Sequence, residues 1–234
     1  MLPPGERVVL VSGANRGLGN AIARRLYADG YRLSLGVRKP DGFPKAPPRD
    51  DRVQVVAYDA ADPAAGDRWV EAAVKRFGRV DAVVNNASIN RWVTVVDGKD
   101  KDLDDLWDIN VKGPFRLIRA AFPHLKAAGS GRIVNIASLS GKRVKSESVA
   151  YPMTKFALMA LSHGCRYSGW EHGIRTTAIC PGVINTDMPD TWAIKREDAV
   201  QPDTLAVVVS MVLTLPNNAS VSELPVNCVL EVTA

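Results

Sequence analysis

A tyrosine and a lysine four positions apart, with a serine upstream, are the side chains of this sequence best suited to acid–base chemistry. On a helix, Tyr151 and Lys155 would share one face, because residues i and i+4 are neighbours there. A free tyrosine has a pKa of about 10 and exchanges protons slowly at neutral pH. A nearby ammonium favours the phenolate and lowers that pKa, so the pair predicts acid–base work on a reacting oxygen. Ser138, at the end of a predicted strand, would donate a hydrogen bond to the same oxygen.

Pro152 limits where the helix that carries this pair can begin. Proline disfavours helical geometry in the preceding residue and is comfortable only in a first helical turn. We therefore expect the helix to begin within a few residues of Tyr151.

A glycine-rich segment near the amino end is suited to binding a pyrophosphate. Gly13, Gly17 and Gly19 lie in SGANRGLG, directly after a predicted strand and at the start of a predicted helix. A strand, a tight turn and a helix N-terminus direct N–H groups and the positive end of the helix dipole at an anion. Taken alone, the glycines also fit a turn that joins strand to helix and binds nothing.

Short segments rich in Val, Ile and Leu alternate with longer segments of helical periodicity. The predicted strands are 7–12, 31–37, 52–58, 80–85, 132–137, 175–180 and 224–230. The predicted helices are 17–29, 63–77, 101–127, 149–172 and 202–213. Nearly continuous apolar strands are typical of sheets covered on both faces, so the alternation predicts an α/β fold with a parallel sheet between two helical layers.

The length and composition fit one domain. A chain of 234 residues with 46% hydrophobic and 24% charged residues matches ordinary globular usage. We find no repeat and expect residues 1–234 to form a single domain. Residues 39–51, rich in proline and charge, predict a surface loop, and the irregular stretch 183–200 predicts a lid over a binding site.

The charge pattern and the cysteines bear on partners and compartment. The net charge of +5 is dispersed, without basic blocks or interleaved aromatic residues, so we expect a solvated basic surface and no nucleic-acid partner. Three scattered cysteines favour a reducing compartment. The apolar run 8–11 is too short for a signal peptide or a membrane span, so we expect a cytoplasmic protein. The three histidines lack ligand spacing, and we expect no metal.

These motifs, in this order, resemble those of the short-chain dehydrogenase/reductase family. SGANRGLG is similar to its TGxxxGxG cofactor motif, with Ser12 at the usual threonine position. Residues 85–87 resemble its NNAG motif after the fourth strand, and 181–186 resemble its PGxxxT segment. The resemblance covers almost the whole chain. It implies a single-domain Rossmann-type fold, doubly wound around a mostly parallel seven-stranded sheet, and an oxidoreductase activity dependent on a nicotinamide cofactor.

The resemblance also implies roles for single residues. Asn110, Ser138, Tyr151 and Lys155 would form a catalytic tetrad, in which Lys155 also binds the nicotinamide ribose. Asn110 would hold the helix backbone and a water molecule in a proton relay, and Asp59 would contact the adenine ring. The expected cofactor contacts are Gly13, Asn15, Arg16, Gly17, Leu18, Gly19, Arg38, Asp59, Ala60, Asn86, Ala87, Tyr151, Lys155, Pro181, Gly182, Val183 and Thr186. The hydride would come from the cofactor.

Two departures from the family pattern concern cofactor fit and subunit packing. Ser88 stands where the family usually has glycine, which adds a Cβ beside the expected path of the nicotinamide ribose. The carboxy-terminal segment lacks the family's frequent glycine-rich turn.

The end of the second predicted strand bears on the choice between the two nicotinamide cofactors. An acid there binds the ribose 2′-hydroxyl and excludes a phosphate, but the segment SLGVRK at 34–39 contains none. Arg38 and Arg16 would instead clamp a 2′-phosphate through charged hydrogen bonds. We therefore expect NADP(H) to be preferred and NAD(H) to be possible, the alternative being that both arginines are solvated surface residues.

The substrate is less readable than the cofactor. We expect a small carbonyl or alcohol compound, most simply a ketone or aldehyde that is reduced with Tyr151 as the general acid. The candidate substrate contacts are Ser138, Ser140, Arg143, Tyr151, Met188 and Trp192. The rim of the expected substrate pocket is positively charged, through Arg91, Lys142, Arg143 and Lys145. This charge fits an anionic substrate, but it fits a solvated surface as well.

Three rival functions use similar folds. A non-catalytic NADP(H)-sensing module could discard the catalytic groups, whereas this chain retains all four. An NAD-dependent alcohol dehydrogenase is disfavoured by the missing acid near Arg38. A sugar-nucleotide epimerase or dehydratase is disfavoured by the glycine spacing and by the length of the chain. Helices 101–127 and 149–172 are apolar over more of their circumference than one sheet face would bury, and the family pairs through these helices, so we expect a homodimer or homotetramer.

Overall fold

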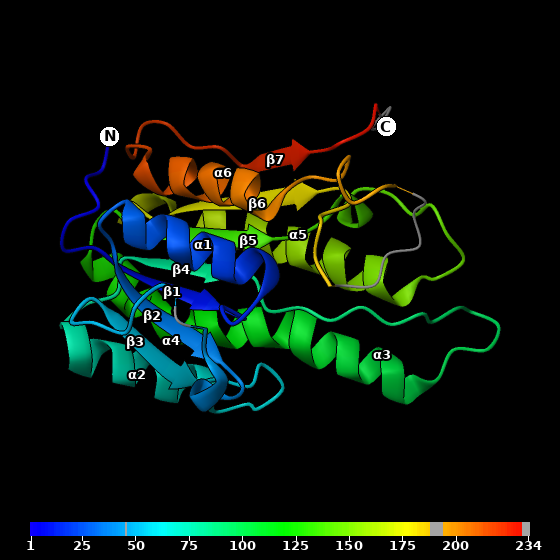
Figure 1. Cartoon of the computed structure of the whole chain (residues 1–234), viewed down its shortest axis with the longest axis horizontal. Helices are drawn as coiled ribbons and strands as arrows, with labels where there is room; N and C mark the ends of the chain where they lie inside the picture. Colours follow the sequence, from blue (N-terminus) through cyan, green and yellow to red (C-terminus); the bar gives the residue numbers. More distant parts are fainter. Residues whose placement is uncertain (45, 188–193, 231–234) are drawn as a thin grey trace.

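Seven parallel strands form one sheet through the centre of the chain (Figure 1), in the computed structural model that describes residues 1–44, 46–187 and 194–230. The strands run in the order β3-β2-β1-β4-β5-β6-β7. They are β1 Val8–Ser12, β2 Arg32–Val37, β3 Val53–Ala57, β4 Ala82–Asn85, β5 Arg132–Ile136, β6 Arg175–Pro181 and β7 Glu223–Val226. The middle strands β1, β4 and β5 are buried along their whole length, as strands covered on both faces must be.

Helices cover both faces of this sheet. They are α1 Gly17–Ala28, α2 Ala65–Phe77, α3 Asp100–Trp107, α4 Gly113–Ala127, α5 Ala150–Gly169 and α6 Pro202–Thr214. α1 and α6 share one apolar cluster with one face of the sheet, while α2, α4 and α5 cover the other face. α3 lies beyond the strand ends, on the side to which the arrowheads point in Figure 1. The predicted Rossmann-type architecture is confirmed.

The strand order creates a crevice at one end of the sheet. β2 and β3 lie on one side of β1, whereas β4 and the later strands lie on the other side. The chain therefore leaves the carboxyl ends of β1 and β4 in opposite directions, and open α/β sheets bind ligands at such a switch point. All the predicted site motifs follow carboxyl ends of strands, so the fold gathers them at this edge.

The predicted long helix 101–127 is two helices joined by a π-helical turn at Asp108–Lys112. Pro114, in the first turn of α4, has no N–H to donate to the residue four positions earlier, which is Asn110. The hydrogen-bond ladder therefore shifts register at this point. π-helical turns are frequent at functional sites, and this one carries Asn110.

The last strand is shorter than predicted, since β7 ends at Val226 instead of position 230. Pro225 lies inside it, and proline is tolerated there because β7 is an edge strand. The helix with Tyr151 begins at Ala150, as the position of Pro152 predicted. In the described parts of the predicted lid, Ile184 and Val200 form an isolated bridge that closes its base.

Candidate active site

The glycine loop after β1 has the geometry of an anion cradle. Gly13 has a φ of +68°, in the left-handed region that disfavours side chains, and a Cβ there would lie 3.0 Å from the Cα of Ala87. A Cβ on Gly19 would overlap the carbonyl oxygen of Gly13. The first turn of α1 contains no acidic residue. The backbone N–H groups at the start of α1 and the positive end of its helix dipole could therefore bind a pyrophosphate.

Ser12 fastens this loop to the segment that follows β4. Its hydroxyl oxygen accepts hydrogen bonds from the backbone N–H groups of Asn86 and Ala87, both at 3.0 Å. The side-chain amide of Asn86 donates in return to the carbonyl oxygens of Ser12 (3.0 Å) and Gly13 (3.3 Å). The two motifs on either side of the crevice are therefore held as one unit.

The other predicted cofactor contacts surround this unit. Arg38 is exposed directly after β2, and Asp59 is exposed after β3, where its carboxylate accepts from the N–H of Ala61 at 3.0 Å. Thr186 lies beside the glycine loop, since a Cβ on Gly17 would be 3.4 Å from the Thr186 methyl group. The remaining members follow the same strand ends: Asn15, Leu18, Ala60, Pro181, Gly182 and Val183.

Arg16 is already engaged in an ion pair. Its guanidinium lies 3.6 Å from the carboxylate of Asp187, and both side chains are largely exposed. An exposed ion pair of this kind contributes little to stability, so little free energy is needed to separate Arg16 from Asp187. Arg38 follows β2 and Arg16 precedes the first turn of α1, and their contact with the adenosine ribose stays a prediction.

Asn110 connects the β4 loop to the helix that carries the tyrosine. Its side-chain oxygen accepts from Ser88 Oγ (3.0 Å) and from the N–H of Ile89 (2.9 Å). Its amide donates to the carbonyl oxygen of Ile89 (2.9 Å) and to Thr154 Oγ1 (3.1 Å). Thr154 Oγ1 in turn donates to the carbonyl oxygen of Tyr151 at 2.8 Å. The partners of Asn110 are thus a loop backbone and two side chains, whereas we had expected a helix backbone.

Ser88 and Thr154 are positioning residues that the sequence did not reveal. The sequence showed Ser88 only as a departure from the glycine that is usual in the family. In the structure its hydroxyl donates a hydrogen bond to the side-chain oxygen of Asn110. Thr154 carried a signal that could have been used, because it lies between Tyr151 and Lys155 and is completely buried on α5.

Ser138, Tyr151 and Lys155 come together at the carboxyl end of β5. Lys155 is 2% exposed, its ammonium donates to the carbonyl oxygen of Ile136 at 3.0 Å, and it lies 5.4 Å from the centre of the Tyr151 ring. Burial lowers the pKa of Lys155 to about 8. Burial raises the pKa of Tyr151 to about 12, and a hydrogen bond with Ser138 opposes that rise.

The direction of the tyrosine shift is opposite to the sequence expectation. We expected the Lys155 ammonium to lower the pKa of Tyr151, but desolvation of the phenol is the larger effect. Its ring packs against the small apolar cluster of Val93, Leu106 and Ala150. At neutral pH the phenol therefore keeps its proton.

Four of the six predicted substrate contacts lie among the described residues: Ser138, Ser140, Arg143 and Tyr151. Ser140 donates its backbone N–H to Ser138 Oγ (3.0 Å), and Arg143 donates to the carbonyl oxygen of Leu139 (3.1 Å). Met188 and Trp192 lie outside the described residues. The positive rim is partly neutralised, because Arg91 pairs with Asp102 (3.4 Å) and Asp105 (3.3 Å). Lys142 likewise pairs with Glu223 at 2.5 Å.

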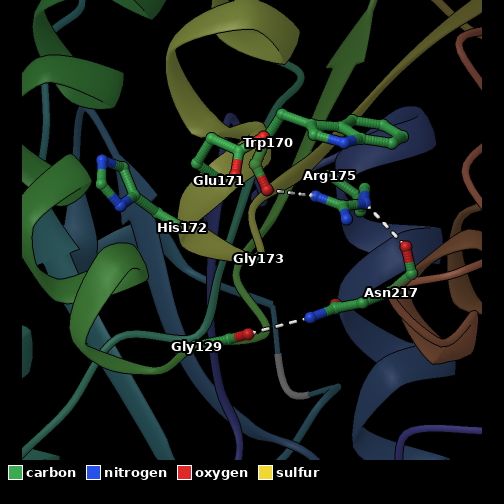
Figure 2. Close-up of a pocket in the computed structure, with 7 residues that line it drawn as sticks. All are labelled: Gly129, Trp170, Glu171, His172, Gly173, Arg175 and Asn217. Carbon is green, nitrogen blue, oxygen red and sulfur yellow. Dashed lines mark hydrogen bonds between the residues drawn. The ribbon is translucent and has the colours of Figure 1, made fainter.

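A separate pocket lies at the opposite end of the sheet (Figure 2). There Arg175 stacks over Trp170 at 3.8 Å and donates to the carbonyl oxygen of Asn217 at 2.8 Å. None of the predicted site residues lines it.

In the described ranges of the chain, no group of three or more His, Cys, Asp or Glu side chains could hold a metal ion. No described helix is both long enough and apolar enough to cross a membrane.

Comparison with known proteins decides the family. A family model described as short chain dehydrogenase matches residues 7–197. The chain belongs to the short-chain dehydrogenase family. The family is one of dehydrogenases, and solved structures of similar fold are complexed with NADH or NADP.

Relatives of this short-chain dehydrogenase include an agropine synthesis reductase from Rhizobium rhizogenes, 42% identical over 97% of this chain and 53% of the relative. The chain thus spans about half the length of that relative. A 3-ketoacyl-(acyl-carrier-protein) reductase from Brucella melitensis, complexed with NADH, is 26% identical with a TM-score of 0.87, over 96% of this chain and 98% of that one. A short chain dehydrogenase from Burkholderia cenocepacia, in complex with NADP, is 28% identical with a TM-score of 0.86, over 97% and 98% of the two chains.

The serine that joins the two loops yields a direct prediction. Ser12→Ala removes the acceptor of two N–H groups, and we expect the free energy of unfolding to fall by about 1–3 kcal/mol. Binding of a nicotinamide cofactor should weaken as well, because the loop loses its attachment to Asn86. Urea denaturation followed by circular dichroism, with a fluorescence titration of NADPH, measures both effects. Ser12→Thr keeps the hydroxyl and should retain both properties; equal stability of the alanine variant would contradict the role of this hydroxyl.

Proposed function

We propose that this short-chain dehydrogenase reduces the carbonyl group of a small ketone or aldehyde with NADP(H), using Tyr151 as the general acid. The observation that carries the proposal is the position of Tyr151, whose ring centre lies 5.4 Å from the buried ammonium of Lys155; that ammonium donates to Ile136, two residues before Ser138. The name of the relative from Rhizobium rhizogenes, a reductase, supports this direction of reaction. The cofactor, when bound, supplies the hydride.

The chain's own residues supply the proton and orient the oxygen. Tyr151, with its pKa of about 12, is protonated at neutral pH and can donate to the oxygen that gains negative charge. Ser138 would donate a second hydrogen bond to the same oxygen. The ammonium of Lys155 would bind the ribose of the nicotinamide and favour the phenolate that is left behind. Asn110 and Thr154 would keep Tyr151 in place through its backbone carbonyl.

The tight glycine loop and the first turn of α1, which contains no acidic residue, fit the pyrophosphate of either nicotinamide dinucleotide. The choice between them rests on Arg38 and Arg16 and on the lack of an acid at the end of β2. Relatives of similar fold are complexed with NADP and with NADH. An NAD-dependent alcohol dehydrogenase is accordingly the second candidate, favoured if Arg16 stays with Asp187.

The substrate class is open to a direct screen. A panel of ketones, aldehydes, oxoacyl thioesters and quinones, each followed by NADPH consumption, would identify the accepted carbonyl. Turnover of any member also excludes a purely cofactor-sensing role. We further propose that the protein works in the cytoplasm, in keeping with its free thiols Cys165, Cys180 and Cys228.

Removing the tyrosine hydroxyl separates catalysis from binding. Tyr151→Phe should abolish turnover and leave NADPH affinity nearly unchanged, because it removes the transferable proton and little volume. Lys155→Ala should harm both, since one ammonium serves the phenol and the ribose. Steady-state rates and fluorescence titrations of NADPH measure the two properties. A large loss of cofactor affinity in Tyr151→Phe would contradict this division of roles.

Reversing the charge at Arg38 tests the cofactor preference. A charged hydrogen bond to a 2′-phosphate contributes about 1.5–3 kcal/mol, so Arg38→Asp should weaken NADPH binding about tenfold or more. NADH should be used as well or better, because the new carboxylate can accept from the 2′-hydroxyl. Lys75→Asp, on the exposed side of α2, makes the same change in charge and should leave the preference unaltered. An unmodified enzyme that already prefers NADH would overturn the NADP(H) proposal.

We also propose a homodimer or homotetramer formed through α4 and α5. Several apolar residues that motivated this idea, such as Leu117 and Leu158, are buried within the chain itself. Phe115 on α4 and Phe156 on α5 nevertheless stay 48% and 44% exposed. Sedimentation at micromolar concentration should show a species larger than the 25.3 kDa chain, and Phe156→Glu should dissociate it. A monomer in the unmodified protein would contradict the proposal.

A further inference from the structure

One carboxylate on the edge strand bonds to both segments that carry the predicted catalytic side chains. Glu223 opens β7. One of its oxygens lies 2.5 Å from the ammonium of Lys142, in the loop after β5, and the other lies 2.7 Å from Nε2 of His163 on α5. Lys142 follows Ser138 by four residues, and His163 follows Lys155 by eight, about two helical turns. Glu223 therefore links the loop of Ser138 to the helix of Lys155.

The segment between Ser138 and Lys142 is a single 3₁₀ turn, Leu139–Gly141, that packs on α5. The N–H of Gly141 donates to the carbonyl oxygen of Ser138 at 2.9 Å. A Cβ on Gly141 would lie 2.8 Å from the carbonyl oxygen of Lys155, so the turn is in close contact with the helix backbone. A shift of Lys142 would therefore move this turn relative to both Ser138 and Lys155.

The pair of Lys142 and Glu223 is more shielded from water than most ion pairs of this chain. Both side chains are only 25% exposed. The hydrogen bond between them raises the pKa of Lys142 and lowers that of Glu223, and the bond to His163 lowers the latter further. Both groups therefore keep their charges at neutral pH, and charge-assisted hydrogen bonds of this kind are stronger than neutral ones.

The packing beneath this pair is apolar. The cluster between the loop, α5 and β6 consists of small and medium side chains: Ala137, Leu139, Leu158, Met159, Ala178 and Cys180. Ala178 is in register with Glu223 on the neighbouring strand, so the two side chains leave the same face of the sheet. Hydrophobic contacts hold layers together but have no direction, whereas charged hydrogen bonds do. Glu223 thus supplies the directional contact that the apolar cluster lacks.

We propose that Glu223 is a positioning residue, which holds Ser138 in register with α5 by binding Lys142 and His163. The proposal rests on the function proposed above, in which Ser138 donates to the substrate oxygen beside Tyr151. Glu223 acts through its two partners, and its effect on turnover comes from the placement of the serine hydroxyl. A misplacement of about 1 Å in an active site can lower a rate about a hundredfold.

Hydrogen–deuterium exchange followed by mass spectrometry tests the positioning role without any substrate. Glu223→Leu is similar in size and has no acceptor, and Lys142→Met removes the charge from the other side. In each variant the peptide 138–143 should exchange about tenfold faster or more, because local opening then costs less free energy. The glycine loop 13–19 should exchange as in the unmodified protein. Unchanged exchange in 138–143 would overturn the proposal, as would an equal rise throughout the chain.

Kinetics with NADPH and the carbonyl compound that the panel shows to be reduced fastest test the consequence for turnover. Glu223→Leu and Lys142→Met should each lower kcat about tenfold or more and leave the Kd of NADPH nearly unchanged. The double variant should be no slower than the slower single variant, because both changes remove one shared contact. Unchanged kcat in both single variants, or an equal loss of NADPH affinity, would contradict the positioning role.

Glu6→Leu is the matched control. Glu6 also pairs at 2.5 Å, with Arg32 at the opposite end of the sheet, so its loss should alter neither kcat nor the exchange of 138–143. If no carbonyl compound of the panel is reduced, the proposed function fails, and the exchange experiment decides the role of Glu223 by itself.

Discussion

The side-chain amide of Asn110 is the point on which the arrangement of the active site depends. It satisfies both its oxygen and its nitrogen with four hydrogen bonds, which join the loop after β4 to helix α5. Because the residue is buried, any partner it lost would leave an unsatisfied polar group, at a cost comparable to a lost hydrogen bond. The π-helical turn brings Asn110 into this position, and Pro114 accounts for the turn. A single irregularity in the helix ladder thus places Tyr151 relative to the crevice.

Two loops and one helix end meet at the switch point of the sheet, and hydroxyl groups connect them. Ser12 joins the glycine loop to the β4 segment, and Thr154 joins Asn110 to the backbone of Tyr151. Both hydroxyls are almost completely buried, where hydrogen bonds are electrostatically stronger than at the surface. The glycine loop and the segment after β4 are therefore held firmly together, whereas the Arg16–Asp187 ion pair is solvated and weak.

The sequence predicted the fold well because the strands are nearly continuous apolar runs and each is followed by a recognisable turn. It predicted the start of α5 from Pro152, since proline acts through local geometry. It missed the π-helical turn, because the apolar periodicity of 101–127 continues across it and only Pro114 marks the interruption. The pKa of Tyr151 was predicted in the wrong direction, because spacing along a helix shows which charges are near but not how deeply a ring is buried. Ser88 and Thr154 escaped for the same reason, as their roles depend on three-dimensional partners.

The proline in β7 has a consequence for the exposed border of the sheet. The carbonyl oxygens of Ser222 and Val226 accept from Ala178 and Gly182 of the β6 segment, so the backbone groups of Pro225 face away from β6. In a strand, backbone groups of alternate residues point to opposite sides, and the outward side of an edge strand is a template for another chain. Proline removes a donor from that side. Strand addition along β7, the route by which parallel sheets polymerise into aggregates, is therefore hindered by one residue that costs the folded chain no hydrogen bond.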